Sequence, residues 1–167
     1  MNVLMRRAAA VCAVTLAVSA APAQSPGDGA VGPRLPAELR ALLIEEMRAV
    51  LDASGNILDA LVRGQDERVA ESAQAIHDSF IMARQMTEAD REALHAAVPH
   101  EFIERDEAFH ELSLSLAEAA RAGDRPRQRE LFADMLEACV DCHTAHATDR
   151  FPELAEEAQA GRAAPAE

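Results

Sequence analysis

Glycine and proline are almost absent from the middle of this chain, and that constrains its fold more than any other feature. Between residues 37 and 151 they occur at only five positions: Gly55, Gly64, Pro99, Gly123 and Pro126. All but Gly55 stand where a helical pattern needs a stop or a start, because glycine ends helices and proline is tolerated in a first turn. The pattern predicts an all-α fold.

Apolar spacing divides this region into four long helices and one short crossover helix. We expect long helices over about residues 36–63, from 66 to about 84–86, over about 101–122, and from 124 past 142, with the short helix at about 87–98. The first helix places apolar residues at intervals of three and four, which predicts one core-facing stripe. Its members are Leu39, Leu43, Met47, Val50, Ile57 and Leu61. Short joins between the long helices favour an antiparallel four-helix bundle.

The joins carry residues that start and stop helices. Gly64 and Gly123 are predicted C-terminal stops, and Asp66 and Asp124 are predicted N-caps. These assignments depend only on local sequence.

The first residues are typical of an export signal. Arg6 and Arg7 precede an apolar run over residues 8–20, and Ala21-Pro22-Ala23 has the small-x-small form of a cleavage site. We expect residues 1–23 to be removed near Ala23 and the protein to reach the periplasm. Residues 24–35 then form a flexible lead-in, residues 36–154 the four-helix domain, and residues 155–167 a frayed tail.

Three cysteines are present, and the leader contains one of them. Cys12 lies inside the apolar run rather than at its end, which disfavours a lipid anchor. Cys139 and Cys142 remain in the mature chain. No later stretch is long and uncharged enough to span a bilayer, so we expect no membrane span.

The charge of the chain is strongly negative. The formal net charge is −13, and loss of two arginines with the leader makes it −15. This balance argues against nucleic acid or an anionic membrane surface as the main partner. The sequence also contains no catalytic carboxylate pair, nucleophile triad or phosphate loop, so nothing supports an enzyme.

The segment Cys139-Val-Asp-Cys142-His143 has the C-x-x-C-H spacing of covalent haem c attachment. Residues i and i+3 project from one face of a helix, so both thiols can form thioethers with the vinyl groups of one porphyrin. His143, one position further on, can bind the iron from the same side. The prediction is one haem c held by Cys139 and Cys142, with His143 as the proximal iron ligand.

Three alternatives to this haem assignment remain open. Cys139 and Cys142 have the spacing of a redox-active dithiol, although such pairs usually lie between a strand and a helix. With His143 and His146 they offer two sulfur and two nitrogen ligands for zinc, provided that the helix distorts. His77 and His110 lie beside apolar stripes and offer a bis-His alternative, although such histidines are more often hydrogen-bonded or half-exposed. His95 and His100 are expected to face solvent.

Beyond the haem motif, three segments carry a resemblance to a known family. They are Phe102-x6-Phe109-His110, the run Ala119-Ala-Arg-Ala-Gly-Asp124, and Phe132-x6-Cys139-x2-Cys142-His143. Over about residues 36–151 the chain resembles the cytochrome c prime family and its low-spin, Met-ligated relatives. The resemblance implies a haem packed between the helices near the C-terminal end of the last helix. The first helix would cover the distal face.

The same resemblance gives the remaining site residues. The family places either methionine or an apolar residue opposite the iron, which here implies Met47, or Leu43 or Ile44 if the register shifts. It also implies Arg40 as a partner of a haem propionate. The family often follows its motif with an aromatic and then a basic residue, but here those places hold His146 and Ala147.

We therefore expect a periplasmic monohaem c-type cytochrome that carries one electron at a time. The alternative is a five-coordinate haem protein that binds NO or CO at an open distal site. An acidic, lysine-free surface favours a redox partner with a basic patch, and a homodimer is compatible with the family.

Overall fold

The computed structural model describes residues 29–78 and 86–156, and this part contains helices and no strands. The elements are η1 (Gly32–Arg34), α1 (Ala37–Arg63), α2 (Asp66–His77), α4 (Glu88–Ala97), α5 (His100–Arg121) and α6 (Arg125–His146). The all-α prediction is confirmed. The predicted leader over residues 1–23, with its predicted cleavage point near Ala23, lies outside the described residues, as do residues 24–28, 79–85 and 157–167.

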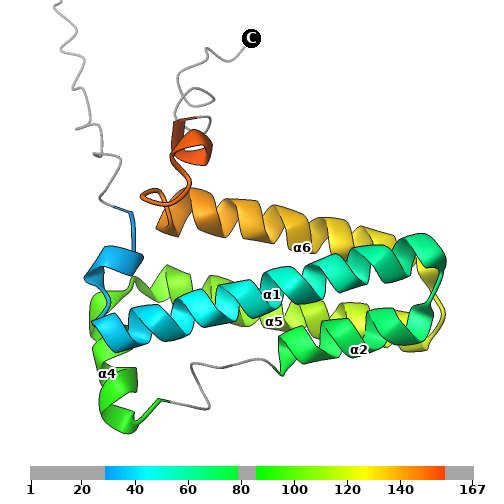
Figure 1. Cartoon of the computed structure of the whole chain (residues 1–167), viewed down its shortest axis with the longest axis horizontal. Coiled ribbons are helices and arrows are strands. Elements are labelled where there is room, and N and C mark those ends of the chain that lie inside the picture. The colour runs from blue at the N-terminus through cyan, green and yellow to red at the C-terminus, as the bar shows by residue number, and fades with distance from the viewer. Residues whose placement is uncertain (1–28, 79–85, 157–167) are drawn as a thin grey trace, which may run out of the picture.

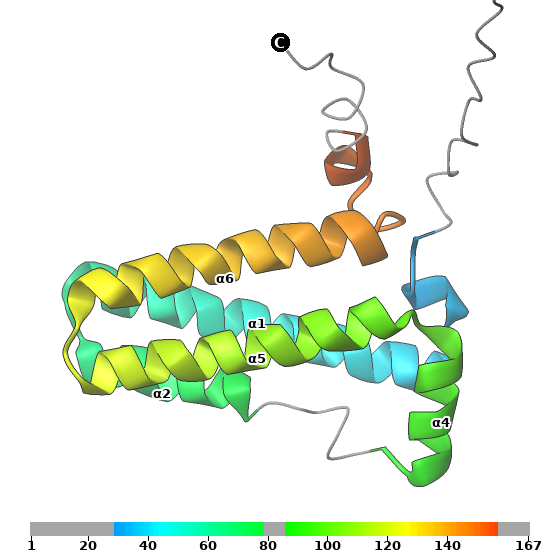
Figure 2. The ribbon, with the colours of Figure 1, turned by 180° about the vertical axis from the view of Figure 1, so that it is seen from behind.

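The helices lie side by side and alternate in direction along the chain (Figures 1 and 2). α2 packs against α1 and α5, and α5 packs against α6, whereas α1 approaches α6 only sparsely. The short α4 lies across the end where α1 begins. As a result, the first half of α1 lies beside the last turns of α6, with little direct contact between the two.

The helix ends follow local chemistry, as predicted. Gly64 and Gly123 have φ values of 68° and 70°, a left-handed conformation that glycine adopts without strain. The Asp124 carboxylate accepts a hydrogen bond from the Arg127 amide at 3.1 Å. Asp66 is the exception, since it is already helical and Gln65 occupies the cap position. Its carboxylate binds the Arg125 guanidinium instead.

The apolar stripe of α1 is only partly as predicted. Leu39, Val50 and Ile57 are buried, but Met47 is 39% exposed and its neighbour Glu46 is buried. The prediction that Met47 belongs to the core stripe is therefore wrong. The physical reason is that α1 packs on α2 but makes little contact with α6, so part of its apolar stripe is left open to solvent.

Residues 29–35 are packed against the helices, which differs from the expected flexible lead-in. Val31 and Leu35 are buried in an apolar cluster with Leu39, Leu94 and Phe102. The Val31 amide donates a 2.9 Å hydrogen bond to the carbonyl of His146, the last residue of α6. This segment therefore closes the same end of the molecule as α4. None of the helices in the described part is both long and apolar enough to cross a membrane.

Candidate functional site

The cysteine and histidine side chains of the C-x-x-C-H segment lie on the last two turns of α6. Cys139, Cys142 and His143 are all half-buried. They lie at the end of the molecule covered by α4 and by residues 29–35. The sequence placed them on one helix, and the structure brings further residues to them from α5 and from the chain after α6.

The two thiols lack the environment of a redox-active dithiol. Burial raises the pKa of Cys139, and burial together with the charge of Asp106 raises the pKa of Cys142 to about 11. Redox-active C-x-x-C pairs need a lowered pKa, which a helix N-terminus supplies, whereas this pair lies near a C-terminus. Both sulfurs are protonated thiols at neutral pH. The dithiol alternative therefore has no electrostatic support.

The imidazole of His143 is neutral and is held by an aromatic ring. Its pKa is lowered by burial, so a ring nitrogen lone pair is available at neutral pH. The ring of Phe151 stacks on it, with centroids 4.3 Å apart and planes 10° apart. Sequence reasoning missed Phe151, because seven residues and the end of α6 lie between it and His143.

His146 faces a different neighbourhood from the two cysteines. It is buried, and its ring packs edge-on against Phe102 of α5 with centroids 5.6 Å apart. Among the residues that the structure describes, no group of three or more His, Cys, Asp or Glu side chains is placed to hold a metal ion. A four-ligand zinc site would require His146 to leave its contact with Phe102.

A guanidinium lies beside the motif on α5. Arg105 pairs with Glu101 at 2.7 Å, and this hydrogen bond is the main reason why the Arg105 pKa is raised. Asp141 and Cys142 add to the same shift, which places Arg105 within electrostatic reach of the motif. Arg105 and Phe151 thus bring a basic group and an aromatic ring close to the motif. The positions at which the sequence was expected to supply them hold His146 and Ala147 instead.

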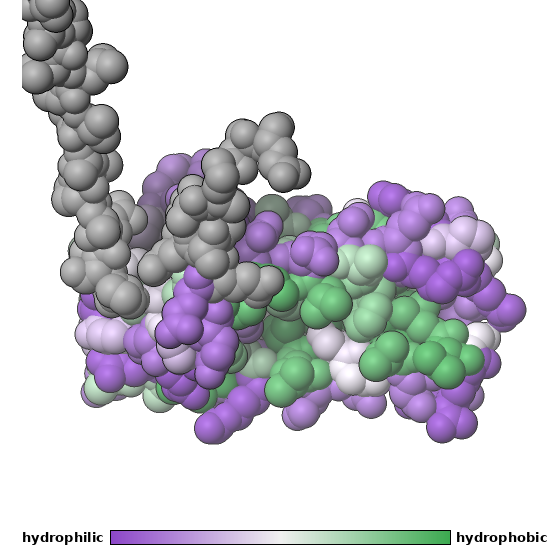
Figure 3. Space-filling model, turned by 90° about the horizontal axis from the view of Figure 1, so that it is seen from above, coloured by the Kyte–Doolittle hydropathy of each residue, from purple (hydrophilic) through white to green (hydrophobic). Residues whose placement is uncertain are grey.

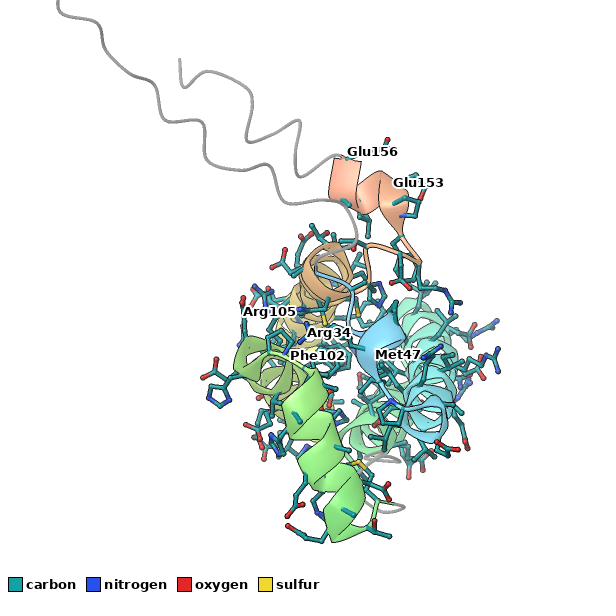
Figure 4. All side chains as sticks on the ribbon, turned by 90° about the vertical axis from the view of Figure 1, so that its left-hand side faces the viewer. Arg34, Met47, Phe102, Arg105, Glu153 and Glu156 are labelled. Atoms are coloured by element: carbon teal, nitrogen blue, oxygen red, sulfur yellow. The ribbon has the colours of Figure 1, made fainter. Side chains whose placement is uncertain are left out.

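Met47 and Arg40 were the two predicted residues on α1. Figure 4 looks along the helices from the end at which α1 begins, with Met47 labelled on α1 and Phe102 and Arg105 on α5. Arg40 is exposed, and its guanidinium donates to the Leu35 carbonyl at 3.1 Å. The structure thus places Met47 on the helix beside the motif and ties Arg40 to the preceding segment.

An apolar surface runs along α1 and α6. Met47 and Leu51 on α1 and Leu136 on α6 are large hydrophobic side chains with 39%, 71% and 59% of their surface exposed. Figure 3 shows hydrophobic side chains gathered along this face of the molecule. Because α1 and α6 make little contact with each other, the apolar sides of both helices remain available to a flat apolar ligand.

A buried polar cluster lies between α1, α2 and α5. The Nδ1 atoms of His77 and His110 each lie near the other residue's backbone carbonyl oxygen, at 3.1 and 3.3 Å. The Nε2 atom of His110 is 3.9 Å from carboxylate oxygens of both Glu46 and Asp106. These contacts use both histidines within the packed helices, so the bis-His alternative would require them to break. His95 and His100 are exposed, as predicted.

Comparison with protein-family models, with curated proteins and with solved structures gave no match. The function of this protein must therefore be inferred from its own residues and their placement.

Proposed function

We propose that this protein is a periplasmic monohaem c-type cytochrome that transfers single electrons. The observation that carries the proposal is the Cys139-Val-Asp-Cys142-His143 segment near the C-terminal end of α6. The side chains of Cys139, Cys142 and His143 are all half-buried. Thioether formation consumes thiols, and both sulfurs here are thiols at neutral pH.

The residues around the motif fit a haem. Its porphyrin is a large flat apolar body, and exposed apolar side chains on α1 and α6 offer the surfaces to cover it. Only 3% of the residues are aromatic, so a haem would supply a large flat apolar group that the side chains of this chain lack. The antiparallel four-helix arrangement, with haem near the C-terminal end of α6, is part of this proposal.

Each residue then has a defined task. Cys139 and Cys142 hold the group covalently, His143 binds the iron through a neutral imidazole, and Phe151 fixes the plane of that imidazole. Haem c bound here would supply a one-electron iron couple, whose potential depends on the axial ligands and on burial. The Sδ atom of Met47 is the proposed distal ligand. Arg40 and Arg105 are the proposed partners of the propionates.

The exposure of Met47 favours a second candidate function. Its side chain is 39% exposed, and Leu43 and Ile44 are half-buried on the same helix. If the Met47 side chain stays exposed and does not bind the iron, the distal position is open and the protein binds small gases such as NO or CO.

Absorption spectra of the oxidised and the reduced protein distinguish the electron carrier from the gas-binding protein. Low-spin bands with a sulfur-to-iron charge-transfer feature are expected for the electron carrier. A high-spin spectrum that shifts when carbon monoxide is added would establish the gas-binding function instead. Purification of a colourless protein from cells that attach haem c would contradict both.

The role of Met47 is tested by the Met47→Ala substitution, which should convert the low-spin spectrum into a high-spin one. Met86→Ala is the matched control, because Met86 is half-buried next to α4 and packs against the apolar cluster that contains Leu35 and Leu94. An unchanged spectrum for Met47→Ala would remove Met47 from the site.

A further inference from the structure

Phe151 is an exposed aromatic residue in a chain that has few aromatic residues. Phe102 is buried and Phe109 and Phe132 are half-buried, whereas Phe151 has 39% of its surface exposed. Burial of a phenylalanine ring stabilises a fold, so this ring gives up part of that stabilisation. Aromatic side chains are enriched where proteins contact one another. The exposed ring is therefore available to a partner protein.

The backbone around Phe151 fixes the position of its ring. The Ala147 carbonyl accepts hydrogen bonds from the amides of Arg150 and Phe151, at 2.9 and 3.0 Å, and these bonds close a tight turn directly after α6. Residues 152–156 are again helical, and Ala155 among them is buried. The ring of Phe151 is thus presented by ordered backbone on both sides.

The stack on His143 connects this exposed ring to the proposed iron ligand. The planes of the two rings are 10° apart and their centroids 4.3 Å apart, so Phe151 covers one face of the imidazole. The imidazole nitrogens lie on the edge of the ring, and the stack does not block them. Electron transfer between two proteins slows steeply as the distance between their redox centres grows. In the proposed cytochrome, a partner that touches Phe151 is separated from the iron by two stacked rings.

Exposed charged residues follow the same part of the chain. Asp149 and Glu153 each stand two positions from Phe151, one on either side. Figure 4 shows Glu153 and Glu156 on the helical residues after α6, directed away from the other helices. Together with the exposed ring these residues form one surface, which we call the Phe151 surface. Its members, all exposed, are Asp149, Arg150, Phe151, Glu153 and Glu156.

The Phe151 surface is negative, because three carboxylates outnumber one guanidinium. The net charge of the whole chain, −13, attracts a basic protein from a distance. Local charge then decides where that protein docks, since complementary charges favour one encounter orientation over others. Redox encounters bury little surface, so one aromatic ring with a charged rim is large enough for such a contact.

We propose that the Phe151 surface is the docking site of a redox protein with a basic patch, and that the electron passes through the stacked rings of Phe151 and His143. This inference rests on the proposed function. The step is a one-electron exchange, in which the reduced iron loses one electron, the oxidised partner gains it, and no bond forms or breaks.

Stopped-flow electron exchange between the haem-loaded mature protein and a small c-type cytochrome with a lysine-rich surface tests the docking site. The double substitution Glu153→Lys with Glu156→Lys should slow the second-order rate about tenfold at low salt and flatten its salt dependence. Glu67→Lys with Glu71→Lys is the matched control, because it makes the same charge change at exposed positions of α2, toward the opposite end of the molecule. Equal rates for the two double variants would overturn the docking site.

The route through Phe151 is tested by removing the ring while keeping an apolar side chain. Phe151→Leu should slow the same exchange several-fold, compared at equal driving force, and Phe151→Tyr should restore the rate. The reduction potential and absorption spectrum of each variant show whether the iron ligands are unchanged. A wild-type rate for Phe151→Leu, or an equally slow rate for Phe151→Tyr, would overturn the route.

A binding measurement gives a readout that does not depend on electron transfer. Addition of the lysine-rich cytochrome to the isotope-labelled protein should shift the amide NMR signals of residues 149–156 and leave those of α2 unchanged. Shifts confined to α2 would contradict the docking site. A colourless protein would contradict the proposed cytochrome itself, whereas a red protein with unaltered rates in all these variants would contradict only the docking site and the route.

Discussion

The ring of Phe151 lies flat on the imidazole of His143, with the two ring centres 4.3 Å apart. Contacts of this kind contribute about 0.5–1.5 kcal/mol beyond simple burial. We therefore expect Phe151→Ala to lower the free energy of unfolding by about 1 kcal/mol in urea denaturation. Phe151→Tyr keeps the ring and should unfold at nearly the wild-type urea concentration. Equal stability of the alanine and tyrosine variants would show that the stack contributes nothing.

Covalent attachment predicts a mass difference that survives denaturation. The intact mass of the unfolded wild-type protein should include one haem, because thioether bonds do not break on unfolding. The double substitution Cys139→Ser with Cys142→Ser should give the mass of the bare chain. Cys12→Ser is the matched control and should keep the haem, since Cys12 belongs to the proposed leader. A bare mass for the wild type would contradict haem attachment.

The packing of residues 29–35 on α6 can be tested at Gly29. A Cβ atom at this position would lie 2.5 Å from the Ala145 carbonyl oxygen, so Gly29→Ala must push the segment away from α6. We expect a loss of about 1–3 kcal/mol in the free energy of unfolding, the usual cost of overpacking. Gly32→Ala, in the same segment, meets only Asp149 at 4.0 Å and is the control. If both variants were equally stable, this contact would not hold the segment.

The joint between α1 and α2 should make stability depend on pH in acid. Asp66 accepts hydrogen bonds from Arg125 and Gln128 at 3.1 Å, and chiefly the Arg125 bond lowers its pKa below 3.8. A carboxyl whose pKa is lower in the folded state stabilises the protein above its unfolded pKa. That stability is lost as the pH falls through the folded pKa.

Asp66→Asn should therefore be less stable than the wild type at neutral pH, with the difference disappearing as the pH falls below about 4. Thermal unfolding measured across this range is the test. Asp134→Asn, at an exposed position of α6, is the control and should show no such convergence. If the difference in stability between Asp66→Asn and the wild type stayed constant at all pH values, ionisation of Asp66 would not be its cause.

The acidic surface predicts how electron exchange depends on salt. With a net charge of −13 over the whole chain, reduction by a cationic mediator should slow as ionic strength rises, because salt screens attraction beyond about 10 Å at 0.1 M. Reduction by an anionic mediator should accelerate, and a neutral one should show no change. Stopped-flow rates for the three mediators are the measurement. A flat response to all three would contradict steering of a basic partner.

The sequence by itself determined the helices and the chemical motif. Both ends of α1, α4 and α5 and the start of α6 follow from local signals such as Gly64 and the Thr87 capping box, and each was predicted to within a residue or two. The grouping of Cys139, Cys142 and His143 was equally predictable. Within one helix, residues three and four apart share a face whatever the rest of the chain does.

The tertiary structure alone decided which residues surround that motif. Helical spacing puts Met47 and Val50 in one predicted core stripe. In the structure Met47 is exposed and Glu46 is buried, because α1 makes little contact with α6. The contacts of Phe151 with His143 and of Val31 with the end of α6 depend on how the chain turns after its helices end. Such contacts depend on how distant parts of the chain pack together, and local hydrophobic periodicity cannot predict them.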